Sequence, residues 1–500
     1  MLCREDPHVT ALPTVTVAAS VPKDCDVLVV GLAEASGADV VVGLPDELTR
    51  PLGRDFAGTA KDLGGSSKNS TTVLLPGPNG LRLVVVGLGD IDVTPEQVRR
   101  AAGAALRAAS GLPGDRPLRV AVSLDAVEPQ VIKGAVEGAL LGAYRYGPVV
   151  DGKPGVGSIH VISSNKRPDA RQALELGLGT AQAVCQARTW VNASPSDLYP
   201  DSFAEEIRAS AKATKVAVEV WDDKALEKEG FGGLVAVGGG SSRKPRLVKL
   251  SYAPRGARFH LVLIGKGITF DSGGLNLKPA DGMYTMKCDM AGAAAVVAAT
   301  EAIAQAGVRI RVTAWAALAE NLPSGDSYRP SDVLTMYGGR TVENGNSDAE
   351  GRLVMADALV RACEEEPSLV VDVATLTGAC VVALGERVAG LMAREDETAD
   401  LVLDAAEAAG ELFWQLPVPE EAREKLNSKV ADLKSTGDRP GGALTAAAFL
   451  SEFVPAGTPW AHLDIAGPAF NPHEPYHYVP SGGTGVAVRT LIALAHALAG

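Results

Sequence analysis

The sequence has 500 residues, of which 46% are hydrophobic and 21% are charged, and its formal net charge is −13. This length and composition indicate a globular protein of two or three domains and exclude a fibrous or disordered chain. The six cysteines form no close pairs in the sequence, so neither a disulfide framework nor a cysteine zinc site is indicated.

Membrane and nucleic-acid partners are both disfavoured. The N-terminal segment MLCREDPHVT lacks the apolar stretch of a secretory signal, and the most apolar helix-like run, residues 291–299, is too short to cross a bilayer. We therefore expect a cytoplasmic protein without membrane contact. Acidic residues exceed basic ones mainly after Trp190, and their repulsion of phosphate argues against nucleic acid as a partner.

Residues 1–165 are expected to form a small N-terminal α/β domain, since β-type runs alternate there with helical stretches such as Pro95–Ser110. Residues 54–70 are rich in glycine and serine and are predicted to be a flexible loop. A linker helix is expected over residues 166–191, because NASPSDLYPD stops the helical pattern with two prolines. The β-type runs are DVLVVGL, ADVVVG, LRLVVVG, RVAVS and HVIS.

Residues 192–500 are expected to form a larger α/β domain. Its strand candidates are continuously apolar, which predicts a central mixed sheet covered by helices and ligand sites at the carboxyl ends of its strands. The candidates are KVAVEVW, RLVKLSY, FHLVLIG, RIRVTAWA, LVVDVA and VAGLMA.

Charged residues gather where these buried strands end. They are Lys266 and Asp271 after FHLVLIG, Asp289 before an alanine-rich helix, and Asp348 and Glu350 in NSDAEGRL. Four carboxylates that converge with a lysine would suit two bridged Zn²⁺, Mn²⁺ or Mg²⁺ ions. A lysine ligand would need a neutral amine, which burial and neighbouring dications favour.

The spacing within DAEGR carries a structural prediction. Residues two apart point to one side of an extended segment but to different sides of a helix. Asp348, Glu350 and Arg352 would therefore share a face only if this segment is extended. We expect the helix to begin near Leu353, with Gly351 easing the turn into it.

The NSDAEGRL segment resembles NTDAEGRL, the signature of the leucyl aminopeptidase family, which comprises the cytosol aminopeptidases. GKGITFDSGG, MKCDMAGAAAV and VDVATLTGA are similar to the other motifs of this family, in the same order. The resemblance implies that residues 192–500 are a catalytic metallopeptidase domain, which releases leucine-like N-terminal residues from peptides by means of a metal-activated water.

The resemblance also implies roles by position. Asp271 and Glu350 would bridge two ions, manganese or zinc. The residues around the tight ion would be Lys266, Asp271, Asp289 and Glu350, and those around the exchangeable ion would be Asp271, Asp348 and Glu350. Lys278 would stabilise the oxyanion, and Arg352 would hold a bicarbonate ion that moves the proton. Arginine itself does not deprotonate in proteins.

The family further implies a pocket for the first side chain and a homohexamer that acts on peptides. The pocket residues would be Met286, Thr375, Ala466 and Ala469. Two departures from the family pattern precede Asp348. Ser347 replaces a threonine, and Asn344 and Gly345 form a turn-favouring pair where apolar residues are usual, so we expect an altered loop entry.

Other patterns allow other interpretations. The segment His473–His477 matches HExxH, so a zincin-type peptidase is an alternative, although Pro475 denies the segment the helix that such a zinc site needs. Asp289 alone could be an ordinary helix cap. The sequence FDSGG around Ser272 is similar to the nucleophile loop of all-β serine proteases, but no suitably placed histidine precedes it. Some bacterial relatives bind DNA, and the acidic balance argues against that additional role.

Overall fold

The computed structural model describes residues 11–53, 55–147 and 153–500, so the segment MLCREDPHVT lies outside the described residues. Two compact units are present. Among the described residues, the larger unit contains Gln186–Pro472 and Gly482–Gly500, and the smaller unit contains the residues from Ala11 to Cys185 together with His473–Ser481. Among the described residues, no helix combines the length and the apolar character that crossing a membrane requires.

The smaller unit is built on a seven-stranded sheet with the order β1-β7-β6-β2-β5-β4, in which β3 also pairs with β2. Along the path β1-β7-β6-β2-β5, neighbouring strands run parallel. Strand β3 is antiparallel to β2, and strand β4 is antiparallel to β5. Its strands are β1 (Thr14–Ala18), β2 (Val27–Ala35), β3 (Ala38–Val42), β4 (Thr72–Pro76), β5 (Arg82–Asp90), β6 (Leu118–Ser123) and β7 (Val156–Ile162). Its helices are α1 (Asp46–Leu52), α2 (Phe56–Asp62), α3 (Pro95–Ser110) and α4 (Pro129–Ala143), and α5 (Pro168–Asn192) continues into the larger unit.

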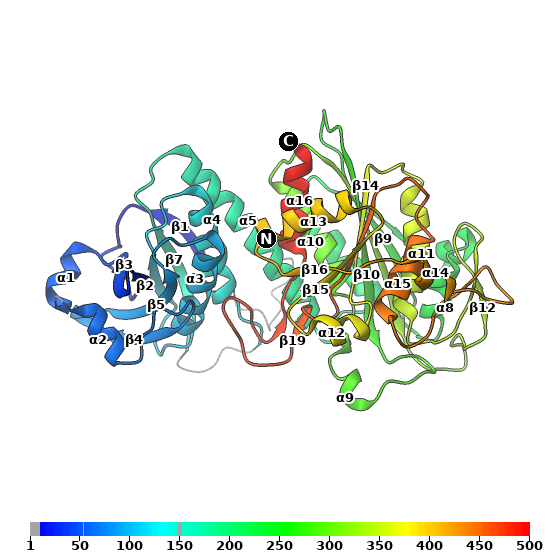
Figure 1. Ribbon diagram of the computed structural model, residues 1–500, viewed down its shortest axis with the longest axis horizontal. Coiled ribbons are helices and arrows are strands. Elements are labelled where there is room, and N and C mark those ends of the chain that lie inside the picture. Colours follow the sequence, from blue (N-terminus) through cyan, green and yellow to red (C-terminus); the bar gives the residue numbers. More distant parts are fainter. Residues whose placement is uncertain (1–10, 54, 148–152) are drawn as a thin grey trace. The chain divides into compact units, whose positions relative to one another are not determined.

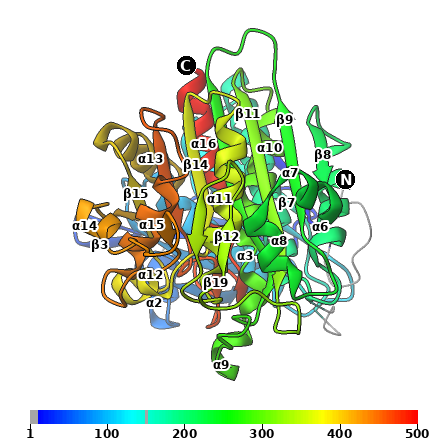
Figure 2. The ribbon, with the colours of Figure 1, turned by 90° about the vertical axis from the view of Figure 1, so that its right-hand side faces the viewer.

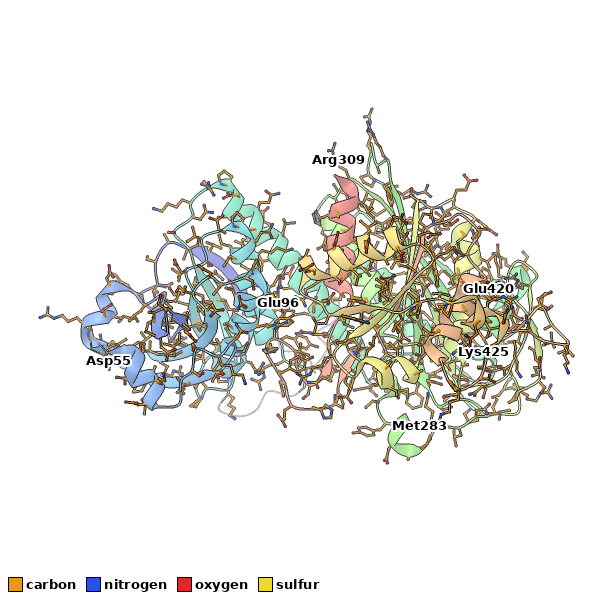
Figure 3. The ribbon with its side chains drawn as sticks, in the orientation of Figure 1. Asp55, Glu96, Met283, Arg309, Glu420 and Lys425 are labelled. Carbon is orange, nitrogen blue, oxygen red and sulfur yellow. The ribbon has the colours of Figure 1, made fainter. Side chains whose placement is uncertain are left out.

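Local chemistry explains where two of these helices begin. The helix predicted over Pro95–Ser110 is confirmed, and its start is fixed by a capping box in which the side chains of Thr94 and Gln97 each bind the other's backbone amide. The predicted flexible loop over residues 54–70 is wrong in its first half. Asp55 (Figure 3) accepts a hydrogen bond from Gly58 N and caps α2, whose Phe56 is buried in the core.

The larger unit is built on an eight-stranded mixed sheet with the order β16-β15-β18-β14-β10-β11-β9-β8. The four central strands β18, β14, β10 and β11 are parallel, and the flanking pairs β15-β18, β9-β11 and β8-β9 are antiparallel. The strands of this sheet are β8 (Ala217–Trp221), β9 (Arg246–Tyr252), β10 (His260–Asp271), β11 (Arg311–Asn321), β14 (Leu369–Ala374), β15 (Ala389–Ala393), β16 (Phe413–Gln415) and β18 (Trp460–Asp464). The predicted mixed sheet is confirmed.

Helices cover both faces of this sheet. In Figure 1, α10, α13 and α16 lie on one side of it and α8, α11 and α15 on the other, and Figure 2 looks onto the second face. The helices of the larger unit are α6 (Pro200–Ala211), α7 (Asp223–Glu229), α8 (Gly232–Gly239), α9 (Ala280–Met283), α10 (Ala291–Gln305), α11 (Glu350–Cys363), α12 (Gly378–Leu384), α13 (Asp396–Ala409), α14 (Glu420–Glu424), α15 (Gly442–Ser451) and α16 (Val488–Ala499). Smaller elements are β12 (Val333–Thr335), β13 (Thr341–Glu343), β17 (Leu433–Lys434), β19 (Phe470–Asn471) and β20 (Gly482–Gly483).

The four parallel strands determine where a site can form. Because parallel strands end at the same edge of a sheet, the residues at and after their carboxyl ends come together there. These are Asp271 at the end of β10, Asn321 at the end of β11, Thr375 after β14 and Asp464 at the end of β18. The strands themselves are almost completely buried.

Candidate metal centre

Lys266 is a buried cation among acidic groups. Its ammonium lies 2.8 Å from a carboxylate oxygen of Asp289 and 2.8 Å from one of Glu350, and it donates a hydrogen bond of 3.0 Å to the carbonyl of Thr375. Burial would lower the pKa of Lys266, but the carboxylates of Asp289, Glu350 and Asp271 outweigh burial and hold that pKa above its ordinary value. Without cations in the site, Lys266 is therefore an ammonium group.

Lys278 joins the other two carboxylates. Its ammonium lies 2.8 Å from Asp271 Oδ2 and 2.7 Å from Asp348 Oδ1, and its side chain is 18% exposed, compared with 3% for Lys266. One carboxylate oxygen each of Asp271, Asp348 and Glu350 can be chosen so that all three lie within 4.8 Å of one another. The sequence expectation that these carboxylates converge is met by the geometry.

The acidic groups carry more charge than the two lysines balance. Burial raises the pKa of Asp289 to about 8 and, together with the charge of Glu350, raises that of Asp271 to about 6. Burial would also raise the pKa of Glu350, but Lys266 and Lys278 outweigh it and hold this pKa below its ordinary value. Glu350 Oε2 is buried and has no hydrogen-bond partner among the described residues. The cluster thus retains acceptor capacity that its own lysines do not use.

Backbone geometry brings Asp348 and Glu350 together in a way that the sequence did not predict. Helix α11 begins at Glu350, with Ala349 before its first residue, so the prediction of an extended DAEGR and a helix from Leu353 is wrong. Gly351 has a different role from the one expected. A Cβ atom there would lie 2.4 Å from Lys266 Cε, so glycine leaves room for the buried lysine.

The helix-cap interpretation of Asp289 is wrong as well. The residue before α10 is Met290, and no side chain caps that helix. Asp289 instead accepts hydrogen bonds from Lys266 Nζ, at 2.8 Å, and from Thr375 Oγ1, at 2.7 Å. Its carboxylate faces the cluster.

A hydrogen-bond network that the sequence did not single out holds the ligand loops. Asn321 donates to Asp271 Oδ1, at 2.8 Å, and to the carbonyl of Ser347, at 2.9 Å. The Ser347 hydroxyl donates to Gly273 O and accepts from Asn276 N, each at 2.8 Å. A serine hydroxyl therefore suffices where the family signature has threonine. Asn321 could have been predicted as a site residue from the sequence, because it stands at the end of an apolar strand.

Hydrogen bonds and close packing hold the loop entry before Asp348, at the pair Asn344 and Gly345. Asn344 is fully buried and donates to the carbonyl of Arg329, at 3.0 Å, and the amide of Gly345 donates to Ser435 Oγ, at 2.9 Å. A Cβ atom at Gly345 would lie 2.3 Å from Thr436 Oγ1. The turn-favouring pair thus fits the close packing of this loop.

Arg352 lies in the first turn of α11 and is buried. One of its terminal nitrogens donates to the carbonyl of Ser435, at 2.8 Å, while its Nε is buried without a hydrogen-bond partner among the described residues. Burial lowers the pKa of Arg352 to about 10, which leaves the guanidinium protonated at neutral pH. A positive group with an unused donor could bind a small anion.

The four expected pocket residues lie on three segments, which follow β14, follow β18 and precede Asp289 in the chain. Thr375 contacts the cluster directly, through Asp289 and Lys266. Ala466 and Ala469 follow β18, and Met286 opens the short helical turn that leads to Asp289. Ala469 is buried, and Met286 and Ala466 are partly exposed.

The alternative catalytic residues do not form a second site of the expected kind. The His473–His477 segment is not helical, which confirms the effect predicted for Pro475, and His477 has a φ of 46°. His477 Nδ1 hydrogen-bonds to Ser70 Oγ at 2.9 Å. The hydroxyl of Ser272 donates to the carbonyl of Asn321, at 2.7 Å, and has a structural role.

Comparisons with known proteins show the family. Residues 185–492 match the catalytic domain of the cytosol aminopeptidase family, and residues 57–148 match its N-terminal domain. A probable cytosol aminopeptidase of Cutibacterium acnes is 50% identical over 95% of this chain and 94% of its own length. A second one, of Micrococcus luteus, is 46% identical over 96% and 98% of the two chains.

Two solved structures are similar over nearly the whole chain. The bottromycin maturation enzyme BotP, in complex with Mn, has a TM-score of 0.84 at 39% identity and covers 95% of this chain and 100% of its own. A mutant of tomato leucine aminopeptidase has a TM-score of 0.84 at 30% identity, with coverages of 99% and 98%. The chain is thus an aminopeptidase, a hydrolase of peptides, and it belongs to the cytosol aminopeptidase family.

Proposed function

We propose that the chain removes leucine-like N-terminal residues from peptides with two divalent cations, held by the cluster of Lys266, Asp271, Asp289, Asp348 and Glu350. The observation that carries the proposal is the convergence of the carboxylates of Asp271, Asp348 and Glu350, to which Lys266 joins Asp289, with Glu350 Oε2 buried without a partner among the described residues. Buried carboxylates that exceed their counter-charges are unfavourable unless cations neutralise them.

The donor set suits hard or borderline divalent cations. Carboxylate oxygens favour ions such as Mn²⁺, Mg²⁺ and Zn²⁺, and the related enzyme BotP was solved with Mn. We propose Mn²⁺ or Zn²⁺ here, with Asp271 and Glu350 shared between two ions. Such ions supply Lewis acidity and lower the pKa of a water molecule that can attack the scissile carbonyl.

The chain's own residues would bind and orient the substrate. Lys278 is the more exposed lysine and, as an ammonium, can stabilise the negative charge that develops on the carbonyl oxygen. Arg352 stays protonated and can hold a bicarbonate ion through its unused Nε–H. The pocket of Met286, Thr375, Ala466 and Ala469 would receive the first side chain. Its mainly apolar lining favours leucine over charged groups.

The proposal has three further features. The homohexamer is implied by the family, whereas the cytoplasmic location and the division into residues 1–165, 166–191 and 192–500 rest on the sequence pattern. No feature of the described residues favours the zincin-type chemistry, and the net charge of −13 argues against an additional DNA-binding role.

Replacement of Glu350 by alanine tests the proposal. Because Glu350 would bind both ions, we expect Glu350→Ala to lose metal retention and to lose at least about 10³-fold in the hydrolysis of leucine amides, the scale of several kcal/mol of metal stabilisation. Metal content and activity should be measured on the same preparation. The control is Glu301→Gln, which alters a buried carboxylate of α10 that binds Ser210 and Gln186. A Glu350→Ala protein with full activity would contradict the proposal.

A further inference from the structure

Asp464 is a completely buried carboxylate at the end of β18, outside the proposed set of metal ligands. A buried charge is unfavourable unless several hydrogen bonds compensate its lost hydration. Asp464 is compensated in this way, because it accepts four hydrogen bonds. Their donors lie on two loops, and these loops are the ones that carry pocket residues.

The first loop, residues 375–377, follows β14. It supplies Leu376 N at 3.1 Å and Thr377 N at 3.4 Å to Asp464 Oδ1, and Thr377 Oγ1 at 2.7 Å to Asp464 Oδ2. The second loop, residues 465–467, follows β18 and supplies Ala466 N at 3.2 Å to Oδ1. One carboxylate therefore ties the ends of two neighbouring parallel strands together.

Both loops reach the candidate site. Thr375, at the start of the first loop, donates to Asp289 Oδ1 at 2.7 Å, and its carbonyl accepts from Lys266 at 3.0 Å. Ala466 is the partly exposed pocket residue of the second loop. Asp464 accepts hydrogen bonds from Leu376 N, next to Thr375, and from Ala466 N, so it links the two segments that carry Thr375 and Ala466.

We propose that Asp464 is a positioning residue that fixes the width of the pocket for the N-terminal side chain, and hence the selectivity of the aminopeptidase. This inference rests on the proposed function, since it assumes that Thr375 and Ala466 line the substrate pocket. Asp464 acts through the two loops and not through contact with the substrate.

Loss of the carboxylate should loosen the pocket. Without it, three backbone amides and one hydroxyl lose their acceptor, and a displacement of about 1 Å in a substrate-positioning segment can reduce a rate about 10²-fold. We expect Asp464→Ala to reduce kcat/KM for leucine p-nitroanilide by about 10- to 100-fold. The leucine-to-alanine ratio of kcat/KM should fall by about tenfold, since one well-packed methylene is worth about 10- to 200-fold in discrimination.

Asp464→Asn separates the hydrogen bonds from the charge. Asparagine keeps an acceptor oxygen for the three backbone amides, and its amide can donate to the Thr377 hydroxyl. We expect Asp464→Asn to keep the leucine-to-alanine ratio of the parent enzyme. A ratio that falls as far in Asp464→Asn as in Asp464→Ala would overturn the positioning role, because the charge alone would then be responsible.

The matched control is Asp357→Ala. Asp357 is also fully buried and accepts hydrogen bonds from two backbone amides, Leu234 N at 2.9 Å and Tyr337 N at 2.8 Å, but it lies in the middle of α11. The Asp357→Ala variant therefore shows how the loss of any buried carboxylate affects stability and activity. We expect a lower melting temperature in both alanine variants and a changed leucine-to-alanine ratio only in Asp464→Ala.

Hydrogen exchange gives a readout that needs neither substrate nor metal. The amides of Leu376, Thr377 and Ala466 should exchange faster in Asp464→Ala than in the parent or in Asp357→Ala. A folded Asp464→Ala protein with parental exchange and a parental leucine-to-alanine ratio would overturn the inference.

Two further results keep the test decisive. If Asp464→Ala does not fold, Thr377→Val removes the 2.7 Å hydrogen bond to Asp464 and Thr377→Ser restores it. The Thr377→Val variant should have a lower leucine-to-alanine ratio of kcat/KM than the parent, and the Thr377→Ser variant should have the parental ratio. Equal ratios in these two variants would overturn the inference. If the parent enzyme releases no N-terminal residue, the proposed function fails, while the exchange experiment still tests whether Asp464 holds the loops.

Discussion

At the scale of single residues, the centre is an assembly of buried charges whose balance is incomplete. Among the described residues, Lys266 and Lys278 form ion pairs with the carboxylates of Asp271, Asp289, Asp348 and Glu350, and the charge of Arg352 also acts on Glu350. Burial is the main cause of the raised pKa values of Asp289 and Asp271, and in the absence of cations it favours protons on these two carboxyl groups. Cations and protons must therefore compete for the same oxygens.

This competition predicts how metal affinity depends on pH. The pKa of Asp289 is raised to about 8 and that of Asp271 to about 6, so both carboxyls gain protons as the pH falls through these values. We expect the affinity for Mn²⁺ to fall by up to about tenfold per pH unit per displaced proton between about pH 8 and pH 5.5, and the proton that Lys266 must lose to bind an ion adds to this dependence and extends it above pH 8. Calorimetric titration in buffers of different ionisation enthalpy measures both affinity and proton release. An affinity that is flat over this range, without proton release, would refute the competition.

Gly351 provides a second test at this scale. A Cβ atom at this position would lie 2.4 Å from Lys266 Cε, and Lys266 is held by three partners, so it cannot move aside without breaking them. We expect Gly351→Ala to lose about tenfold or more in activity, with a stability loss of about 1–3 kcal/mol.

The control for Gly351→Ala is Gly282→Ala in α9, next to Met283 (Figure 3), because an added Cβ there meets nothing within 4 Å. Activity and melting temperature should be compared in both variants. Equal behaviour of the two would show that Lys266 does not require the space at Gly351.

The sequence predicted which residues gather at the centre better than it predicted what supports them. The candidate metal ligands could be recognised in the sequence because charged residues rarely follow buried strands. The order of the family motifs supported the same residues. Asn321 and Asp464 went unnoticed for a physical reason, since their roles depend on loops brought together from distant parts of the chain. Their hydrogen-bond partners lie up to 88 residues away.

At the scale of elements, strands made of apolar runs were predicted well from the sequence. Strands that contain charged or polar residues were predicted poorly. RLVKLSY and LVVDVA correspond residue for residue to β9 and β14. The central strand β18 was missed because its sequence, WAHLD, places His462 and Asp464 in a fully buried strand. The early start of α11 was missed for a similar reason, since Glu350 and Arg352 tolerate burial only through partners that the sequence does not reveal.

The packing of α4 on α3 offers a test of element packing. Gly134, Gly138 and Gly142 recur every four residues on α4, and a Cβ atom at Gly138 would lie 2.1 Å from the backbone carbonyl oxygen of Arg99 in α3. We expect Gly138→Ala to destabilise the smaller unit by about 1–3 kcal/mol or more, because a backbone atom cannot move aside as a side chain can.

Urea unfolding measures the effect of Gly138→Ala. The control is Gly179→Ala in α5, where an added Cβ meets nothing within 4 Å and alanine should stabilise the helix by up to about 1 kcal/mol. Equal unfolding midpoints in the two variants would contradict the close packing of α3 and α4.

At the scale of the whole molecule, the two compact units are not continuous in sequence. The segment His473–Ser481 packs within the smaller unit, where Tyr478 donates to Glu96, at 3.0 Å, and Arg107 donates to the carbonyl of His477. A Cβ atom at Gly103 would lie 2.4 Å from Tyr478 Cβ. Local patterns could not predict this arrangement, because it depends on contacts between residues 382 positions apart.

The same segment contains the HExxH match, and its packing explains why those residues are polar without forming a zincin helix. His477 binds Ser70, and the backbone around it forms a short bridge between Tyr476 and Val479. We therefore expect the metal ions at the cluster where the parallel strands end, and not at this segment.

The most direct test is a crystal structure of the full chain loaded with Mn²⁺, in which anomalous scattering locates the ions. We predict two ions between Asp271 and Glu350, about 3.5–4 Å apart, with Lys266 and Asp289 at one of them and Asp348 at the other. A single ion at this cluster, or ions bound at His473 and His477 instead, would contradict this prediction.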